Sequence, residues 1–122
     1  FLLFRLLTTL DTRWKLNEEM KLISASGLYW QYSDTKWTLP DEGEKGFIET
    51  LDKTQVLGVD GELIKYANIA MQSKNVSDSA HQLWEKGIAD SFGYFTVKSS
   101  ASDLYLACFS NCLGWPQCLN GK

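Results

Sequence analysis

An internal repeat constrains this chain more than any other feature of its sequence. Trp37 is followed nine positions later by Gly46, an aromatic residue and a large apolar residue, and Trp84 is followed by Gly93 in the same way. The two copies stand 47 residues apart. Each copy continues into short apolar segments separated by a polar turn, an order that predicts β-hairpins sharing one core. We therefore expect an all-β fold built from repeated hairpin units.

The repeat period also predicts the domain organisation. The chain has 122 residues, which is enough for one compact domain and too few for two. We expect a single domain over 1–122, with units at approximately 1–45, 46–92 and 93–122. The third unit ends about 17 residues before an equal unit would be complete, so we expect it to be incomplete. Its open edges would then be available to pair with a second copy of the chain.

A competing signal lies between the two copies of the repeat. Residues 63–71 carry apolar side chains at helical spacing, and Asp78–Trp84 has the composition of a capped helical turn. Because intrinsic propensity is a weak guide that tertiary context overrides, we give the repeat more weight. We expect a single helical turn at most around 78–84.

The last segment, Phe109–Lys122, departs from the repeat. Pro116 lacks a backbone N–H, which argues against a central strand there, and we interpret the segment as a cap or a tail. Cys108, Cys112 and Cys118 lie close together, but their spacing lacks the paired ligands of a metal site. We expect small buried side chains or a single local disulfide, and no metal.

The segment from Gly46 to Val97 resembles the ricin-B-type lectin repeat. It has the Gly-aromatic strand opening, a second strand ending in Asp60-Gly61, and the triplet Gln82-Leu83-Trp84 before the next opening. The resemblance implies β-trefoil-like hairpin repeats. It also implies that three residues belong to the structural core of the repeats: Trp37, Gln82 and Trp84. Trp14, Trp30 and Trp115 have no partner in the sequence repeat.

The resemblance further implies a sugar site made of a carboxylate, an aromatic ring and a turn amide. Hydroxyl groups bind the polar groups, and the ring covers the apolar face of the sugar. In this sequence the carboxylate position falls on Gly58 and, in the next unit, on Ala107. The ring position falls on Gln72. The candidate ligand-binding residues are Asp60, Gln72, Asn75 and Asp78.

Composition narrows the function classes. The net charge is −3 and no cluster of Lys or Arg is present, so we expect no nucleic-acid partner. No apolar run is long enough to span a membrane. The only histidine, His81, is not accompanied by a nucleophile motif, so we expect no enzyme activity and no cofactor.

Three functional hypotheses follow. The first is a carbohydrate-binding, lectin-like module without catalytic activity, whose partner is a glycan or glycoprotein. The alternative is a β-trefoil protein-interaction or structural module that has lost its sugar site. A third is an incomplete product that cannot close its barrel and is therefore molten, aggregated or a homodimer through its open third unit. The compartment stays open, with secretion as one option.

Overall fold

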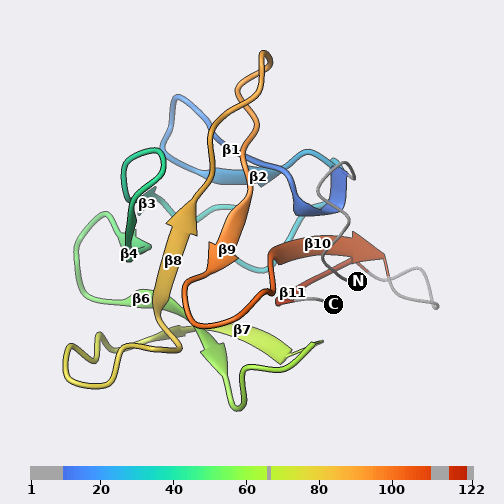
Figure 1. The fold of residues 1–122 in the computed structure, drawn as a ribbon. Helices are drawn as coiled ribbons and strands as arrows, with labels where there is room; N and C mark the ends of the chain where they lie inside the picture. Colours follow the sequence, from blue (N-terminus) through green and yellow to red (C-terminus); the bar gives the residue numbers. More distant parts are fainter. Residues whose placement is uncertain (1–9, 66, 111–115, 121–122) are drawn as a thin grey trace.

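The computed structural model describes residues 10–65, 67–110 and 116–120 and is all-β, which confirms the expected fold class (Figure 1). Within those residues the only helical element is a short 3₁₀ turn, Leu10–Thr12. The strands, in chain order, are β1 (Trp14–Leu16), β2 (Leu22–Ser24), β3 (Trp37–Thr38), β4 (Lys45–Phe47), β5 (Glu49–Thr50), β6 (Val56–Asp60), β7 (Ala67–Gln72), β8 (Leu83–Lys86), β9 (Val97–Ser99), β10 (Leu106–Ser110) and β11 (Pro116–Asn120).

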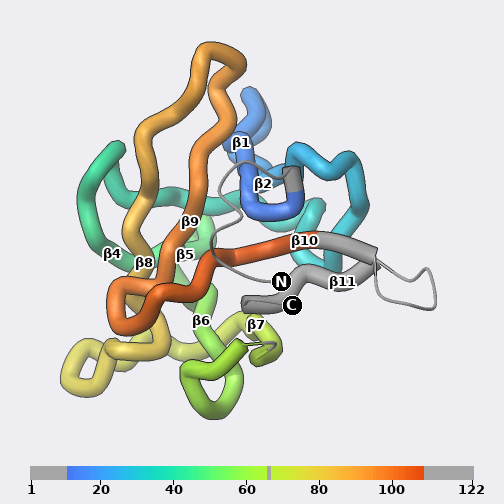
Figure 2. Tube along the Cα trace, turned by 45° about the vertical axis from the view of Figure 1, so that its right-hand side comes forward, coloured from blue at the N-terminus to red at the C-terminus, as the bar shows by residue number. Residues whose placement is uncertain are grey.

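The strands form three antiparallel sheets. β1 pairs with β2, β4-β8-β9 form a three-stranded sheet, and the largest sheet has the order β10-β11-β7-β6-β5-β3. The connection between β8 and β9 extends from the rest of the molecule as a long arm, which is the orange loop at the top of both views (Figures 1 and 2). Three isolated β-bridges add to these ladders and join Trp14 with Phe95, Lys21 with Lys36, and Lys98 with Tyr105.

The structure resolves the competing helical signal in favour of strands. β7 occupies part of the segment with helical spacing, because alternate residues Ala67 and Ile69 are buried while Asn68 is exposed. Residues 80–82 form a turn that leads directly into β8. The apolar pattern of 63–71 thus belongs to a strand and the loop before it.

The expectation that Pro116 excludes a central strand is wrong. β11 lies between β10 and β7 in the large sheet. Pro116 is its first residue, a position where a missing N–H is tolerated. Cys108 is disulfide-bonded, and the β10–β11 register places Cys118 directly opposite it. Trp115 lies outside the described residues.

Three buried tryptophans share one backbone setting. Each is paired in antiparallel register with a buried Ser or Thr, and the pairs are Trp14–Ser24, Trp37–Thr50 and Trp84–Ser99. In every case the residue after the Ser or Thr donates its N–H to the carbonyl of the residue before the Trp. These bonds are Ala25 to Arg13 (2.8 Å), Leu51 to Lys36 (3.0 Å) and Ser100 to Leu83 (3.0 Å).

Trp14 is therefore a third copy of a setting that the sequence repeat shows only twice. The sequence interpretation that Trp14 has no equivalent in the repeat is wrong, because Trp14 has the same strand pairing as the other two tryptophans. The fixed period missed it because Trp14 and Trp37 are 23 residues apart, whereas Trp37 and Trp84 are 47 residues apart. We call residues 15–36, which lie between Trp14 and Trp37, the shortened segment, because it has about half the length of the stretch between Trp37 and Trp84. A search at one fixed period cannot detect it.

The shortened segment fills its part of the core with aromatic rings. The ring centres of Trp30 and Trp14 lie 5.1 Å apart. The Tyr32 ring lies between those of Trp30 and Trp37, with centre-to-centre distances of 5.4 and 6.0 Å, and all three pairs have edge-to-face geometry. The Trp30 indole also donates to the Leu22 carbonyl at 2.9 Å. Trp30 is held by packing and by this hydrogen bond, so the residues beside it start from a fixed backbone.

The indole N–H groups of the three equivalent tryptophans differ in a way that can be tested. Trp14 donates to the Leu106 carbonyl and Trp84 to the Leu57 carbonyl, each at 2.9 Å, whereas Trp37 Nε1 is buried without a partner among the described residues. Trp84→Phe and Trp14→Phe each remove a hydrogen bond to a backbone carbonyl, and Trp37→Phe removes a buried donor that has no partner among the described residues. We expect Trp84→Phe and Trp14→Phe to lower the free energy of unfolding by about 1–2 kcal/mol more than Trp37→Phe. Urea unfolding measures the differences, and equal losses in all three variants would contradict the hydrogen-bond assignment.

Candidate functional site

The sequence-predicted residues Gln72, Asn75 and Gln82 lie in one hydrogen-bond network. Gln82 is buried, and its amide nitrogen donates to Gln72 Oε1 and to the Ser73 carbonyl, both at 2.9 Å. Its amide oxygen accepts the Asn75 N–H at 2.8 Å. Gln72 Nε2 in turn donates to the Val59 carbonyl at 3.1 Å. These amides therefore hold the end of β7 and the following loop against β6.

The same network occupies the positions that the family resemblance assigns to a ligand. Gly58 faces Gln72, and a Cβ built on Gly58 would lie 2.2 Å from Gln72 Oε1. The side-chain amide of Gln72, the residue at the expected ring position, thus occupies the space beside Gly58, where the family has its carboxylate. Both amide atoms of Gln72 are committed to the protein itself.

The other two predicted residues do not complete a sugar site with this network. Asp78 lies close to it, since its N–H donates to Asn75 Oδ1 at 3.1 Å, but its side chain is exposed. Asp60 is exposed and pairs with Asn68, whereas Gln72 pairs with Val56 at the opposite end of the β6–β7 ladder. The structure therefore brings Gln72, Asn75, Asp78 and Gln82 together and leaves Asp60 apart.

A hollow of about 380 Å³ on the shortened segment has a more suitable set of groups. Tyr29, directly before the anchored Trp30, is 66% exposed, so its ring is presented to solvent. Its hydroxyl donates to Asp34 Oδ2. Lys21 Nζ lies 4.0 Å from Asp34 Oδ1. One hollow thus combines an accessible ring, a carboxylate and an ammonium group.

Local turn chemistry fixes this arrangement. Gly27 has a φ of 82°, a conformation that favours glycine, and it redirects the chain after β2. Ser33 Oγ accepts the Trp30 N–H at 2.6 Å, which closes the turn between Tyr29 and Asp34. The ring and the carboxylate are therefore positioned by a short turn that is attached to the core through Trp30.

The electrostatics of the hollow leave its polar groups accessible. The hydrogen bond to Asp34 raises the pKa of Tyr29, with smaller contributions from burial and from the negative charge of Asp34. Asp34 is 74% exposed, and Lys21 also contacts Glu19 at 3.7 Å. Exposed ion pairs of this kind stabilise a fold little. The carboxylate and the ammonium group remain free to exchange water for a polar ligand.

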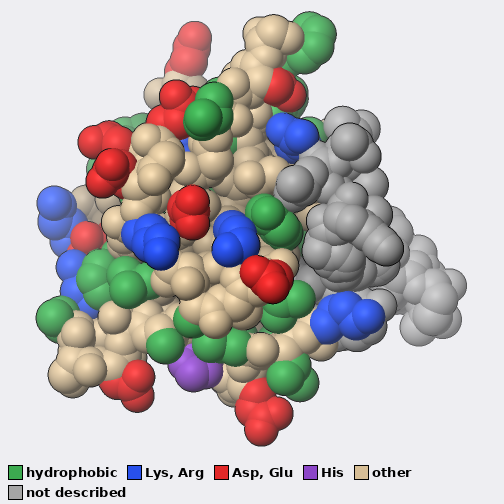
Figure 3. All heavy atoms as spheres, viewed as in Figure 1, with side chains coloured by type: hydrophobic (Ala, Val, Ile, Leu, Met, Phe, Trp, Pro, Cys, Tyr) green, Lys and Arg blue, Asp and Glu red, His purple; other side chains and the backbone are tan. Residues whose placement is uncertain are grey.

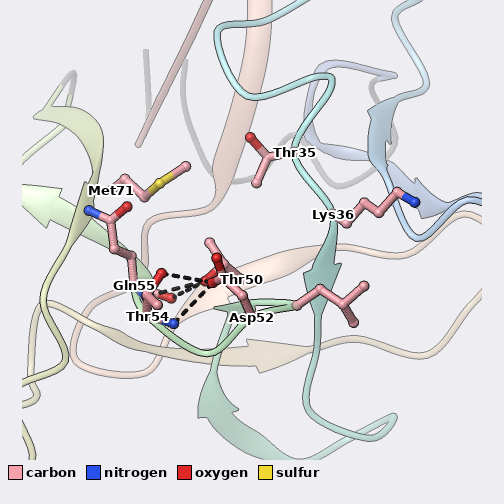
Figure 4. Close-up of a pocket in the computed structure, with 8 residues that line it drawn as sticks. Thr35, Lys36, Thr50, Asp52, Thr54, Gln55 and Met71 are labelled. Atoms are coloured by element: carbon pink, nitrogen blue, oxygen red, sulfur yellow. Dashed lines mark hydrogen bonds between the residues drawn. The ribbon is translucent and has the colours of Figure 1, made fainter.

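A second hollow, of about 450 Å³, is lined by Thr50 and by residues of the loop after it. Thr50 pairs with Trp37 as Ser24, which lines the first hollow, pairs with Trp14. Asp52 Oδ1 accepts hydrogen bonds from the hydroxyls of Thr54 and Thr50, both at 2.7 Å, and these bonds lower the pKa of Asp52. Figure 4 shows these groups tied to one another, with Lys36 apart from them. No aromatic side chain lines this hollow among the described residues. It offers hydroxyls without a stacking surface.

The sequence reasoning missed Lys21, Tyr29 and Asp34. All three lie in the shortened segment, which the 47-residue period does not align. The available signal was the cluster Tyr29-Trp30 with Tyr32, in which a buried ring next to an exposed one marks a rigid stacking surface.

Further searches of the described residues gave two negative findings. No group of His, Cys, Asp and Glu side chains there could hold a metal ion, and no helix there is long and apolar enough to cross a membrane. On the face seen in Figure 3, acidic and basic side chains are interspersed. No protein-family model, curated protein or solved structure matches the chain.

The contact between Gly58 and Gln72 predicts the effect of substituting Gly58. Gly58→Ala must displace a Gln72 amide that is held by two hydrogen bonds, so we expect a loss of about 1–3 kcal/mol in the free energy of unfolding. Most of this loss should disappear when Gly58→Ala is made in a Gln72→Ala background. Denaturant unfolding of the four proteins gives the coupling energy, and equal costs in both backgrounds would refute the contact.

The bond between Tyr29 and Asp34 predicts a titration shift. Ionised tyrosine loses its donor and faces a carboxylate, so Tyr29 should titrate above the ordinary tyrosine pKa of about 10. We expect Asp34→Ala to lower the pKa of Tyr29, as followed by NMR of ring-labelled tyrosine. Glu19→Gln is the matched control, because Glu19 contacts Lys21 but not Tyr29. An unchanged Tyr29 pKa in Asp34→Ala would show that the hydrogen bond does not form in solution.

Proposed function

We propose that this chain is a carbohydrate-binding, lectin-like β-trefoil module without catalytic activity, and that its sugar site is the hollow formed by Tyr29, Asp34 and Lys21. The observation that carries the proposal is the exposed Tyr29 ring beside the Asp34 carboxylate. A ring covers the C–H face of a pyranose, and a carboxylate accepts hydrogen bonds from its hydroxyls. This site differs from the one that the family resemblance implied.

The β-trefoil part of the proposal is supported by the three equivalent tryptophans. A trefoil needs three units around a shared core, and Trp14, Trp37 and Trp84 supply three matching strand pairings. Unequal units are compatible with this arrangement, because the shortened segment fills its share of the core with Trp30 and Tyr32. The last segment also joins this core, because β11 pairs with β7 and so extends the large sheet.

The chemistry of the hollow favours a neutral sugar with adjacent hydroxyl groups. Asp34 accepts hydrogen bonds, and Lys21, 4.0 Å away, donates them, so a pair of neighbouring hydroxyls can satisfy both. The hollow is open and shallow, and a ligand with one stacking surface and few polar contacts binds weakly. We therefore expect dissociation constants in the millimolar to micromolar range.

A protein-interaction module is the alternative, and the β8–β9 arm is the observation in its favour. Ile88 and Phe92 are each 75% exposed on this arm. The turn between them is ordered by Asp90, whose Oδ1 accepts the N–H groups of Phe92 and Tyr94 at 2.9 and 3.0 Å. A rigid apolar tip suits contact with another macromolecule.

The sugar site is tested with two aromatic substitutions. A broad glycan array identifies a glycan bound by the wild-type protein, and amide-resolved NMR titration then measures its affinity. Tyr29→Ala should weaken binding about tenfold or more, because the stacking surface is removed. Phe92→Ala, which removes an equally accessible ring from the β8–β9 arm, should leave the affinity unchanged. Failure of the folded wild-type protein to bind any glycan would reject the proposal, and a loss confined to Phe92→Ala would transfer the binding site to the arm.

A further inference from the structure

A third hollow, of about 480 Å³, lies where the segments that follow Trp14, Trp37 and Trp84 meet. β1 contributes Lys15, the loop after β3 contributes Leu39 to Glu42, and the end of β8 contributes Lys86. The loop is fixed to the β8–β9 arm by the Ala89 N–H, which donates to Glu42 Oε2 at 2.7 Å. The hollow is thus a built feature of the fold and is separate from the Tyr29 site.

Two lysines in this hollow lie against aromatic rings and form no ion pair with a described carboxylate. Lys15 Nζ lies 5.3 Å from the centre of the Tyr94 ring, and Lys86 Nζ lies 4.7 Å from the centre of the Phe95 ring. Both side chains are partly buried, and neither forms an ion pair among the described residues. Rings hold the two ammonium groups in place but leave their N–H donors available to an anion.

The remaining walls limit the kind of anion that fits. Leu16, Leu39 and Phe95 give the hollow an apolar part next to the two lysines. Asp41 and Glu42 also line it, and their carboxylates would repel a ligand with several negative charges. A volume of this size accepts a small organic molecule. The walls therefore favour one negative group attached to a short apolar body.

We infer that this hollow binds a small amphiphilic monoanion, in which a carboxylate or sulfate group contacts Lys15 and Lys86 and an alkyl or aryl group packs on Leu16 and Leu39. The inference does not depend on the proposed glycan site. Charge-assisted hydrogen bonds from two lysines would supply the specificity for the anion, and burial of the apolar group would supply the affinity.

The test is a titration of the full chain, followed by amide-resolved NMR at physiological salt, with four probes. Octanoate and octyl sulfate carry the two anionic groups, octanol lacks the charge, and inorganic sulfate lacks the apolar body. We expect either amphiphilic anion to shift the signals of Lys15, Leu39, Lys86 and Ala89 with one dissociation constant, and octanol and inorganic sulfate to bind at least about tenfold more weakly. The better of the two amphiphiles identifies the preferred anionic group.

Three variants make the result specific to this hollow. Lys15→Met and Lys86→Met keep a long side chain on each ring but remove the charge, and each should weaken octanoate or octyl sulfate binding about tenfold. Lys98→Met is the matched control, because Lys98 pairs with Asp103 at 3.9 Å and does not line the hollow, so it should have no effect. Tyr29→Ala should also bind normally, which separates this result from the glycan proposal. Equal binding of octanol, equal binding of inorganic sulfate, equal losses in Lys98→Met, or no shifts at these residues would each overturn the inference.

Discussion

The pairing of a buried tryptophan with a buried Ser or Thr is the contact on which the rest of this structure depends. It occurs at Trp14, Trp37 and Trp84, and all three indoles are almost fully removed from water. A large ring at each point contributes apolar burial, and the neighbouring backbone bonds set the strand register. Two of the indoles add hydrogen bonds to carbonyls in β6 and β10. These indole hydrogen bonds join strands that are distant in sequence, β1 to β10 and β8 to β6.

Much of the all-β fold follows from the sequence because short apolar strands separated by polar turns leave a strong local pattern. The strands around Val56–Asp60 and Leu106–Ser110 and the turns before them were predictable from that pattern. Trp14 was not predictable, because the segment that follows it is about half the length of its counterpart. Pro116 was misleading, because a proline at the first residue of a strand leaves the later residues free to pair.

The candidate sites show why residue positions transferred from a family can differ from the chemistry of a particular chain. Gln72 occupies a ligand position in the sequence pattern, but in the structure its amide bonds to Gln82 and to the Val59 carbonyl. Conversely, Tyr29 and Asp34 lie five residues apart in a segment without a family motif, and only the turn closed by Ser33 brings their side chains together. Sequence spacing alone does not predict that turn, which is closed by the hydrogen bond from the Trp30 N–H to Ser33 Oγ.

The place of Trp14 in the core has a consequence for how the chain is made. Its N–H and carbonyl pair with Phe95, and its indole reaches Leu106, a residue 92 positions later. During synthesis Ser24 and Trp30 follow Trp14 early, but the contacts of Trp14 with Phe95 and Leu106 form only after those residues have left the ribosome. Contacts with such a long sequence separation also slow folding, because the intervening chain loses much entropy before they form. The yield of folded protein would then depend on chaperones that cover the segment around Trp14 during synthesis, and not only on the stability of the folded core.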